Sequence, residues 1–239
     1  MGSEDSDDDT PRLSAHTLAA LQDFLSARDP AAHLDDGDEE INPAATEGLA
    51  RGGETKGNEM TLDIVSEDWR LSQFWYDQPT ARAVAQELFF LSKQFHSPIA
   101  CISCPSLYVE LKKNYAAEVF LFEYDPRFQR YGNDYTFYDY NFPEELPERH
   151  HHAFHVVVAD PPYLSRECIE KTVQTMKLIA KDDDTCFLLL TGAVQQDYAK
   201  DLLGACPCVF KPTHQNKLGN EFLLYTSYDP LDRLGGWMK

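Results

Sequence analysis

The chain has 239 residues, which is enough for one domain of ordinary size and an additional segment. Hydrophobic residues make up 43% of the chain and supply a core, but no stretch approaches the ~20 apolar residues that cross a bilayer, which excludes a membrane-spanning helix. The net charge is −19, and a field of this sign repels the phosphates of nucleic acids and attracts cationic partners.

The negative charge is concentrated at the N-terminus, because residues 1–60 contain fifteen acidic and four basic residues. Within the acidic segment 1–27, leucines recur at helical spacing and predict a short amphipathic helix over 13–27. Residues 28–60 contain few large apolar side chains to offset the entropy lost on ordering, so we expect a flexible acidic linker there. The folded domain is expected to span residues 61–239.

Beyond residue 79, short apolar runs alternate with stretches that are compatible with helices. Strands are expected at 99–103, 118–122, 135–138, 154–159, 185–190, 208–210 and 222–227. Helices are expected at 79–95, 105–114, 165–180 and 193–203, with a weaker one at 126–131. This alternation indicates parallel strands joined by crossover helices that cover both faces of a sheet.

The end of the chain breaks the alternation. The segment 211–221 is polar and contains a proline and a glycine, so it is a poor helix and the last two strands should form an antiparallel hairpin. The expected fold is therefore α/β, a doubly wound, seven-stranded, mostly parallel sheet with a terminal antiparallel hairpin. A ligand is expected beyond the carboxyl ends of the strands, at the point where the strand order reverses.

A proline-rich corner follows the fourth expected strand, where the sequence reads Asp160-Pro161-Pro162-Tyr163. The two prolines remove two N–H donors and restrict the backbone, so that carbonyl oxygens are held as fixed acceptors. With the Asp160 carboxylate and the Tyr163 ring beside them, these oxygens are suited to hold an amine and aim its lone pair at an electrophile. The alternative is an ordinary turn after a buried strand, and the alternating context favours a catalytic site.

This corner resembles that of the amine-directed class I S-adenosylmethionine-dependent methyltransferases, whose seven-stranded sheet also ends in an antiparallel hairpin. Six segments closely resemble the eukaryotic elongation factor 1-alpha lysine methyltransferase 1 family, formerly assigned to N6-adenine DNA methylation. These segments are 71–81, 122–128, 137–141, 159–165, 191–193 and 218–222, and the similarity covers 8–27 and 62–230. The resemblance implies a protein-lysine N-methyltransferase that uses S-adenosylmethionine and acts on elongation factor 1-alpha.

The strand ends offer groups for this cofactor. Glu123 follows the second expected strand and is placed to accept hydrogen bonds from a ribose diol, as an acid does in dinucleotide-binding sheets. Asp125 lies two positions later on the same side and is expected to assist; a solvated carboxylate is the alternative for Glu123. Asp139 and Tyr140 resemble the adenine-contacting position of the family, with aromatic packing at the edge of the sheet as an equal alternative.

The loop after the first expected strand departs from the usual class I pattern, because Ser103-Cys104-Pro105 contains no glycine. S-adenosylmethionine has no phosphate, so a nest of backbone N–H groups for a pyrophosphate is not required. We expect Ser103 and Cys104 to let the methionine portion approach and Pro105 to begin the next helix. A defective cofactor site is the alternative.

The resemblance also assigns residues around the methyl group and the substrate. It places Phe74 and Trp75 at the methionine end of the cofactor, where aromatic rings attract a sulfonium by about 0.5–2 kcal/mol; a buried hydrophobic plug is equally compatible. It further implies that Asn220 and Phe222 join Tyr163 in binding the substrate. By the same resemblance Asp160 borders the cofactor as well as the amine.

We expect no metal site. Cys101 and Cys104 have CxxC spacing but no second such pair, and the adjacent histidines His150, His151 and His152 should point in divergent directions on a solvent-exposed loop. The six cysteines lie mostly in apolar runs and no signal peptide opens the chain, so we expect reduced thiols in a cytoplasmic protein. We also expect a monomer.

Charge separates the two nitrogen substrates that fit the corner. A base-flipping enzyme must hold a phosphate backbone, yet the densest positive charge is the isolated pair Lys112-Lys113. A basic protein substrate is therefore favoured over the N6 amine of adenine, and stable nucleic-acid binding is not expected. A non-catalytic scaffold that keeps the fold for protein binding is a further alternative.

Overall fold

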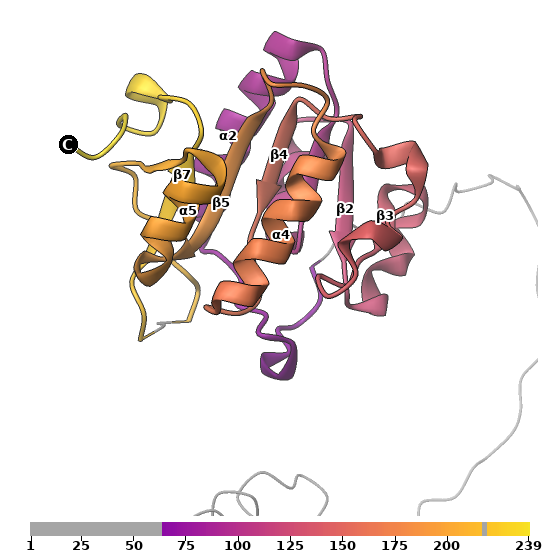
Figure 1. The fold of residues 1–239 in the computed structure, drawn as a ribbon. Helices are drawn as coiled ribbons and strands as arrows, with labels where there is room; N and C mark the ends of the chain where they lie inside the picture. The colour runs from indigo at the N-terminus through magenta and orange to yellow at the C-terminus, as the bar shows by residue number, and fades with distance from the viewer. Residues whose placement is uncertain (1–63, 217–218) are drawn as a thin grey trace, which may run out of the picture. The chain divides into compact units, whose positions relative to one another are not determined.

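A computed structural model describes residues 64–216 and 219–239 of the chain. The expected helix at 13–27 and the expected linker at 28–60 lie outside these residues. In the described part, seven strands form one sheet that is flanked by helices (Figure 1). No helix in this part of the chain has the length and apolar content needed to cross a membrane.

The sheet has the expected doubly wound topology. Its strands are β1 (Ile99–Ile102), β2 (Val119–Glu123), β3 (Tyr135–Phe137), β4 (Val156–Ala159), β5 (Cys186–Gly192), β6 (Cys206–Pro207) and β7 (Phe222–Thr226). They lie in the order β3-β2-β1-β4-β5-β7-β6. Strands β1 to β5 pair in parallel, whereas β7 runs antiparallel to both β5 and β6, so the expected seven-stranded fold with a terminal antiparallel hairpin is confirmed.

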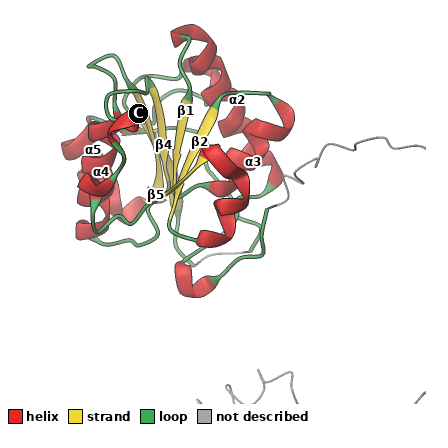
Figure 2. Ribbon diagram, turned by 90° about the vertical axis from the view of Figure 1, so that its right-hand side faces the viewer, coloured by secondary structure: helices red, strands yellow, loops and turns green. Residues whose placement is uncertain are grey.

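The helices cover both faces of the sheet. The α-helices are α2 (Gln78–Phe95), α3 (Pro105–Asn114), α4 (Arg166–Ile179) and α5 (Gln196–Leu203). The 3-10 helices are η1 (Trp69–Leu71), η2 (Pro126–Asp134), η3 (Pro143–Glu145), η4 (Glu148–His150), η5 (Ala193–Gln195) and η6 (Leu231–Arg233). Figure 2 shows α2 and α3 on one side of the strands and α4 and α5 on the other. The weak helix expected at 126–131 is the 3-10 helix η2.

Local sequence explains where these helices begin and end. The Asp77 side chain accepts a hydrogen bond from the Thr80 N–H at 2.9 Å and caps α2, and Ser165 caps α4 through the Cys168 N–H at 3.2 Å. Helix α5 ends at Gly204, which has φ +63°. Glycine adopts this left-handed conformation without steric cost, so the chain turns there into β6.

Alternate strand residues fill two separate cores, as expected for a sheet covered on both faces. In β1, Ile99 and Cys101 pack into the core beneath α2 and α3, whereas Ala100 and Ile102 pack into the core beneath α4 and α5. All four side chains are fully buried. The central strands are therefore held rigidly, and their ends make a stable platform for a site.

The sixth strand differs from its expected position. It occupies Cys206–Pro207 rather than 208–210, because the chain leaves the sheet after Pro207 and pairs with the C-terminal segment. The Val209 N–H donates to the Gly236 carbonyl at 2.9 Å, and the Phe210 N–H donates to the Leu234 carbonyl at 3.1 Å. The apolar run is thus extended as expected but has a different partner.

The histidine run also differs from expectation, because His150 is not exposed to solvent. Its ring is buried and lies 3.0 Å from the Thr136 hydroxyl, and burial lowers its pKa to about 4. His152 is exposed, and His151 is half-buried against the Leu146 carbonyl. Within residues 64–216 and 219–239, no group of three or more potential metal ligands is found.

Candidate active site

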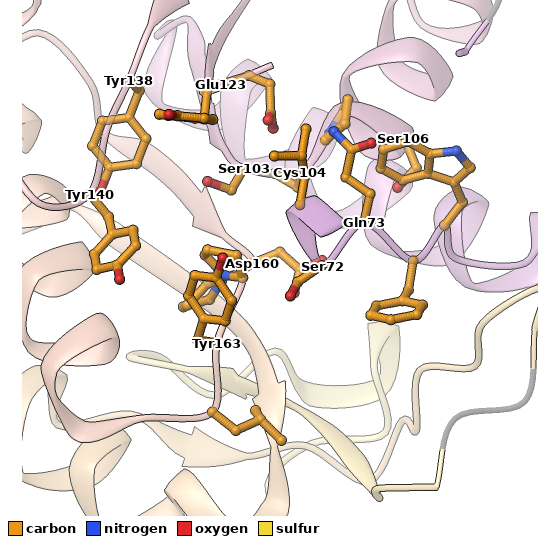
Figure 3. Close-up of a pocket in the computed structure, with 18 of the residues that line it drawn as sticks. Ser72, Gln73, Ser103, Cys104, Ser106, Glu123, Tyr138, Tyr140, Asp160 and Tyr163 are labelled. Atoms are coloured by element: carbon orange, nitrogen blue, oxygen red, sulfur yellow. The ribbon is translucent and has the colours of Figure 1, made fainter. Parts of the chain in front are cut away.

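A cavity lies at the carboxyl ends of β1, β2 and β4, where the strand order reverses. Its volume is about 610 Å³, which is within the range of about 300–1,000 Å³ that is typical of ligand sites. Figure 3 shows side chains from these strand ends directed into it. The predicted site residues on its wall are Phe74, Trp75, Ser103, Cys104, Pro105, Glu123, Asp139, Tyr140, Asp160, Pro161, Pro162, Tyr163, Asn220 and Phe222.

The register of the sheet aligns three of these residues. Ile102 of β1 is paired with Phe122 of β2 and with Ala159 of β4, so the residues that follow, Ser103, Glu123 and Asp160, form a row across adjacent strands. The Ser103 N–H donates to the Phe122 carbonyl at 2.8 Å, and the Asp160 N–H donates to the Ile102 carbonyl at 3.0 Å. Backbone pairing therefore fixes the spacing of the row independently of any ligand.

The turn after β1 explains the missing glycine. Ser103 has φ +54°, a left-handed conformation that most residues avoid and that glycine adopts readily. Serine thus adopts this positive φ without a glycine, and α3 then begins at Pro105 with Cys104 as its N-cap. The Cys104 thiol is buried and donates to the Val158 carbonyl at 3.8 Å, and burial keeps its pKa well above the ordinary value. A fixed thiol and a tight turn form this part of the wall.

Glu123 supplies a buried carboxylate to the wall. One of its oxygens accepts the Asp125 N–H at 3.1 Å. Burial raises its pKa to about 7, and the charge of Asp125 contributes in the same direction. Donors from a ligand, such as the hydroxyls of a ribose, would compensate for this buried charge, so the side chain fits the predicted ribose contact.

Asp160 supplies a second carboxylate next to the two prolines. Burial raises its pKa to about 8, the nearby Tyr76 hydroxyl opposes this shift, and the charge of Glu123 adds to it. Pro161 is buried and Pro162 is half-buried, so the backbone of the corner is held in place. At neutral pH these surroundings keep Asp160 largely protonated, and a cationic ligand would favour its ionised form.

Two tyrosines stand at the mouth of the cavity. Tyr163 is 44% exposed, and its ring lies edge-on to that of Tyr140 with 6.0 Å between the centroids. The Asp139 carboxylate accepts hydrogen bonds from the backbone and the side chain of Asn141, both at 2.9 Å. Figure 3 shows Tyr140 and Tyr163 on the side of the cavity where Asp160 lies. An elongated apolar chain would pack against such rings.

The structure places Asp125 outside the cavity wall, which differs from its predicted role beside Glu123. Its carboxylate accepts hydrogen bonds from the Arg127 Nε at 2.8 Å and from the Gln73 Nε2 at 3.0 Å, and these bonds lower its pKa against the effect of burial. The Gln73 Oε1 in turn accepts from Arg127 at 2.9 Å. The Asp125 side chain thus holds the segment before α2 against η2. It supports the cavity wall through Gln73, in addition to the contact of its backbone N–H with Glu123.

The aromatic segment before α2 divides between the cavity and the core. Phe74 and Trp75 line the cavity, and the Trp75 indole N–H donates to the Val65 carbonyl at 2.9 Å. Tyr76 lies behind them and is 2% exposed. Phe74 and Trp75 therefore lie on the cavity wall, while Trp75 and Tyr76 belong to the buried core, and the contact with the cofactor stays a prediction.

Sequence reasoning missed several residues of the wall. Gln73 and His214 come from segments outside the strands and helices, and no local pattern marks them as site residues. His214 lies on the loop before β7 together with Asn220, and its ring is 4.8 Å from that of Phe222. The isolated bridge between Tyr76 and His214 brings this loop to the cavity through a long-range contact.

Fold and site together define a class of enzyme. A sheet with a reversed β7, an acid at the end of β2 and an Asp-Pro-Pro-Tyr corner after β4 are the features of a class I methyltransferase. The family described as "Probable N6-adenine methyltransferase" matches residues 67–230. The chain belongs to this family and, within it, to the family of EEF1A lysine methyltransferase 1.

The similarity to curated relatives extends over nearly the whole chain. EEF1A lysine methyltransferase 1 of Mus musculus is 43% identical and is aligned over 95% of this chain and 96% of the relative. The Homo sapiens protein of the same name is 42% identical over 93% and 94%. A protein-lysine N-methyltransferase of Dictyostelium discoideum is 36% identical over 94% of each chain.

Among solved structures, the branched-chain polyamine synthase of Thermus thermophilus, in complex with N4-aminopropylspermidine and 5'-methylthioadenosine, has a similar fold. The TM-score is 0.50 at 13% identity, with 71% of this chain and 65% of that chain covered. At this identity the likeness concerns the fold alone.

Proposed function

We propose that this chain is an S-adenosylmethionine-dependent protein-lysine N-methyltransferase that acts on elongation factor 1-alpha. The observation that carries this proposal is the aligned row of Ser103, Glu123 and Asp160 on the wall of one cavity. It joins a carboxylate suited to a ribose with a corner suited to an amine. The relatives named EEF1A lysine methyltransferase 1 support elongation factor 1-alpha as the substrate.

The wall fits the cofactor by its chemistry. Glu123 would hold the ribose hydroxyls, the turn at Ser103 would leave room for the methionine portion, and Phe74 and Trp75 would face the sulfonium. When bound, S-adenosylmethionine supplies a methyl group that is activated for displacement. The cavity contains two carboxylates whose charged form is disfavoured by burial, and a cationic ligand would offset this penalty.

The corner after β4 would orient the target amine. The carboxylate of Asp160 and the carbonyl oxygens of the restrained backbone accept N–H groups, while Tyr163 packs along the apolar part of a lysine. Displacement at a methyl carbon needs orientation and electrostatic fit rather than a covalent intermediate. The residues at the corner meet this requirement without a nucleophilic side chain.

Charge supports a protein substrate over a nucleic acid. The net charge of −19 opposes the approach of a phosphate backbone and favours a basic protein. All six cysteines are free and five of them are buried, which supports a reducing compartment, and we place the enzyme in the cytoplasm as a monomer.

Transfer of labelled methyl groups tests this function. Purified elongation factor 1-alpha and adenine-containing DNA oligonucleotides would be offered in parallel to the wild type and to Asp160→Ala. We expect label on lysine of the elongation factor, none on DNA and a large loss with the variant. Label on DNA alone would support the N6-adenine activity that the family description names. Absence of heat on titration with S-adenosylmethionine would instead support a non-catalytic scaffold.

A further inference from the structure

His214 is an ionisable side chain on the cavity wall that the function described above does not use. It comes from the loop before β7, the loop that also brings Asn220 and Phe222 to the cavity. The imidazole lies between two aromatic rings, with centroid distances of 4.5 Å to Tyr76 and 4.8 Å to Phe222. Its orientation is therefore fixed by packing on both sides.

The nitrogens of this ring are not engaged by protein groups within residues 64–216 and 219–239. No hydrogen bond joins either nitrogen to a described protein group, whereas the described histidines near β4 have polar contacts: His150 with Thr136, His151 with Leu146, His152 with Ala180 and His155 with Asp182. A histidine that is held by stacking and keeps both nitrogens available at a cavity is suited to exchange a proton with a ligand.

Tyr76 connects His214 to the amine-binding corner. Its ring lies against that of His214 at an interplanar angle of 33°, and its hydroxyl is a neighbour of Asp160. The hydroxyl is buried but completes no hydrogen bond within the described part of the chain. One tyrosine ring thus separates His214 from the carboxylate that would hold the target amine, and both face the same cavity.

The reaction requires a proton acceptor at this place. A lysine side chain has a pKa of about 10.4 and arrives as an ammonium, which has no lone pair for attack. If Asp160 took the proton, its carboxyl group would present an O–H to the amine and lose an acceptor. A separate acceptor leaves the corner free to orient the nitrogen.

We propose that His214 accepts the proton of the target lysine ammonium before methyl transfer. This inference rests on the proposed function. The ammonium gives one proton to an imidazole nitrogen, and the freed lone pair forms the N–C bond. The bond between the methyl carbon and sulfur breaks with its electron pair on sulfur, and the imidazolium then releases the proton to solvent. The acceptor is thereby restored for the next turnover.

The charges around His214 agree with this role. Burial lowers its pKa below the ordinary value, and the carboxylates of Glu67 and Asp77 act in the opposite direction. Asp160 has a pKa raised to about 8, so at neutral pH it adds little negative charge near the imidazole. At neutral pH the side chain is therefore a neutral base, and an approaching ammonium meets a free lone pair.

The decisive test compares His214→Asn with the wild type over pH 5.5–9.5. General base catalysis contributes about 10²–10⁴-fold, so we expect kcat at pH 7 to fall at least ~100-fold while KM changes little. In the wild type, log kcat should rise with unit slope and level off above the pKa of His214. In the variant it should keep rising, because only the minor free-amine population of the lysine then reacts. If His214→Asn keeps the wild-type kcat and the wild-type plateau in its pH profile, the inference is overturned.

His152→Asn is the matched control. This histidine is exposed, precedes β4 at the opposite end of the sheet from the cavity, and has φ +51°, which asparagine tolerates. Its variant should keep the wild-type rate and pH profile. A similar loss in both variants would show that the effect is not specific to the cavity and would overturn the inference.

Two further measurements separate proton transfer from packing. His214→Ala opens a slot between Tyr76 and Phe222, and added imidazole should restore the rate at least ~10-fold in proportion to its neutral form, as expected for an exogenous base. In the unliganded protein, the histidine NMR signal that is lost in His214→Asn should titrate below the ordinary pKa. Absence of rescue, or a signal that titrates above it, would count against the role.

Further measurements distinguish a failure of the proposed function from a failure of the role of His214. Calorimetry should give equal affinity for S-adenosylmethionine in the wild type and His214→Asn. A lost affinity with an unchanged kcat would make His214 a binding residue and overturn its role as proton acceptor. Failure of the wild type to methylate elongation factor 1-alpha would overturn the proposed function, and this inference with it, whereas an active wild type and an equally active variant would overturn the inference alone.

Discussion

Asp160, a half-buried carboxylate on the cavity wall, links the electrostatics of the site to the stability of the folded protein. Its pKa is raised to about 8 and that of Glu123 to about 7, whereas in the unfolded chain both titrate near their ordinary values. At pH values between the ordinary pKa values and the raised ones, the folded state binds more protons than the unfolded state. The free energy of unfolding must therefore fall as the pH rises through this window.

We expect the wild type without ligand to be less stable at pH 9 than at pH 6, and Asp160→Asn to remove a large part of this difference. At pH 9 the free energy of unfolding of Asp160→Asn should exceed that of the wild type by about 2 kcal/mol. One pKa unit corresponds to about 1.4 kcal/mol, and solvent relieves part of the shift. Urea unfolding at both pH values measures it. Asp183→Asn, an exposed carboxylate before β5, is the control and should leave the pH dependence unchanged.

Ser103 allows a test of the turn that replaces a glycine loop. A non-glycine residue in the left-handed region costs about 1–2 kcal/mol, whereas glycine avoids this cost but loses about 0.5–1 kcal/mol of backbone entropy. We therefore expect Ser103→Gly to change stability by less than about 1 kcal/mol and to retain cofactor affinity. Ser103→Val should destabilise by about 2 kcal/mol or more, because a β-branched residue fits this conformation poorly.

Thermal unfolding and calorimetry with S-adenosylmethionine check both variants. Equal behaviour of valine and glycine at this position would contradict the argument, because it would mean that the backbone of the turn is not constrained by the sheet. A loss of affinity in Ser103→Gly alone would assign the contact to the serine hydroxyl instead.

At the scale of elements, the C-terminal segment is fastened to α2 by a buried ion pair. The Glu87 side chain is 1% exposed and accepts hydrogen bonds from the Arg233 Nε at 2.6 Å and from the Tyr228 hydroxyl at 2.9 Å. Segment 234–236 then pairs with 209–210. The contact with Glu87 therefore supports the edge of the sheet that carries the loop of His214.

Arg233→Ala should destabilise the protein by about 2–3 kcal/mol, somewhat below the usual range for a broken buried pair because the arginine is partly exposed. It leaves the Glu87 charge buried with one hydroxyl as its partner. The double variant Glu87→Gln with Arg233→Ala should recover part of the loss. Chemical unfolding measures these effects, and the exposed Arg82→Ala, whose contact with Glu110 is 3.9 Å long, should have almost no effect. Equal losses for Arg233 and Arg82 would contradict this role.

The strands also show what could be predicted from sequence and what could not. The five parallel strands were located because buried strands read as short apolar runs between helices, and Ser103, Glu123 and Asp160 followed from their ends. The sixth strand was displaced because Val209 and Phe210 pair with residues far along the chain. A local sequence pattern cannot reveal a pairing partner that lies so far along the chain.

The same reason limits the prediction of the site. Gln73 and His214 reach the cavity from irregular segments, and long-range contacts with Arg127 and Tyr76 place them. Asp125 was assigned to the cofactor from its spacing to Glu123, but Arg127, only two residues further on, engages its carboxylate. Sequence spacing identifies which acidic residues are close to a strand end. The hydrogen-bond partners of their carboxylates decide which of these residues face a ligand.

At the scale of the whole molecule, charge is unevenly distributed. Residues 1–60 carry a net charge of −11 and the other residues −8. Fields from such a segment extend over about 8–10 Å at physiological ionic strength and raise the rate of encounter with a cationic partner. We therefore expect the acidic N-terminus to contribute to substrate capture independently of the cavity.

Deletion of residues 1–60 should lower kcat/KM for elongation factor 1-alpha at low salt by about 10-fold and flatten its dependence on ionic strength, with little change at 0.5 M salt. A variant of equal length, in which the fifteen acids are replaced by the matching amides, separates charge from chain length and should behave like the deletion. Superimposable salt profiles for all three proteins would refute electrostatic steering.

The left-handed serine after β1 has a consequence for finding enzymes of this kind in genomes. Searches that require a glycine-rich signature would discard this chain, although Ser103 adopts there the positive φ that favours glycine. A screen keyed on the torsion angles of the turn, together with acidic residues at matching heights on neighbouring strands, would retain it. Homologues that sequence motifs overlook can then be found from their backbone conformation.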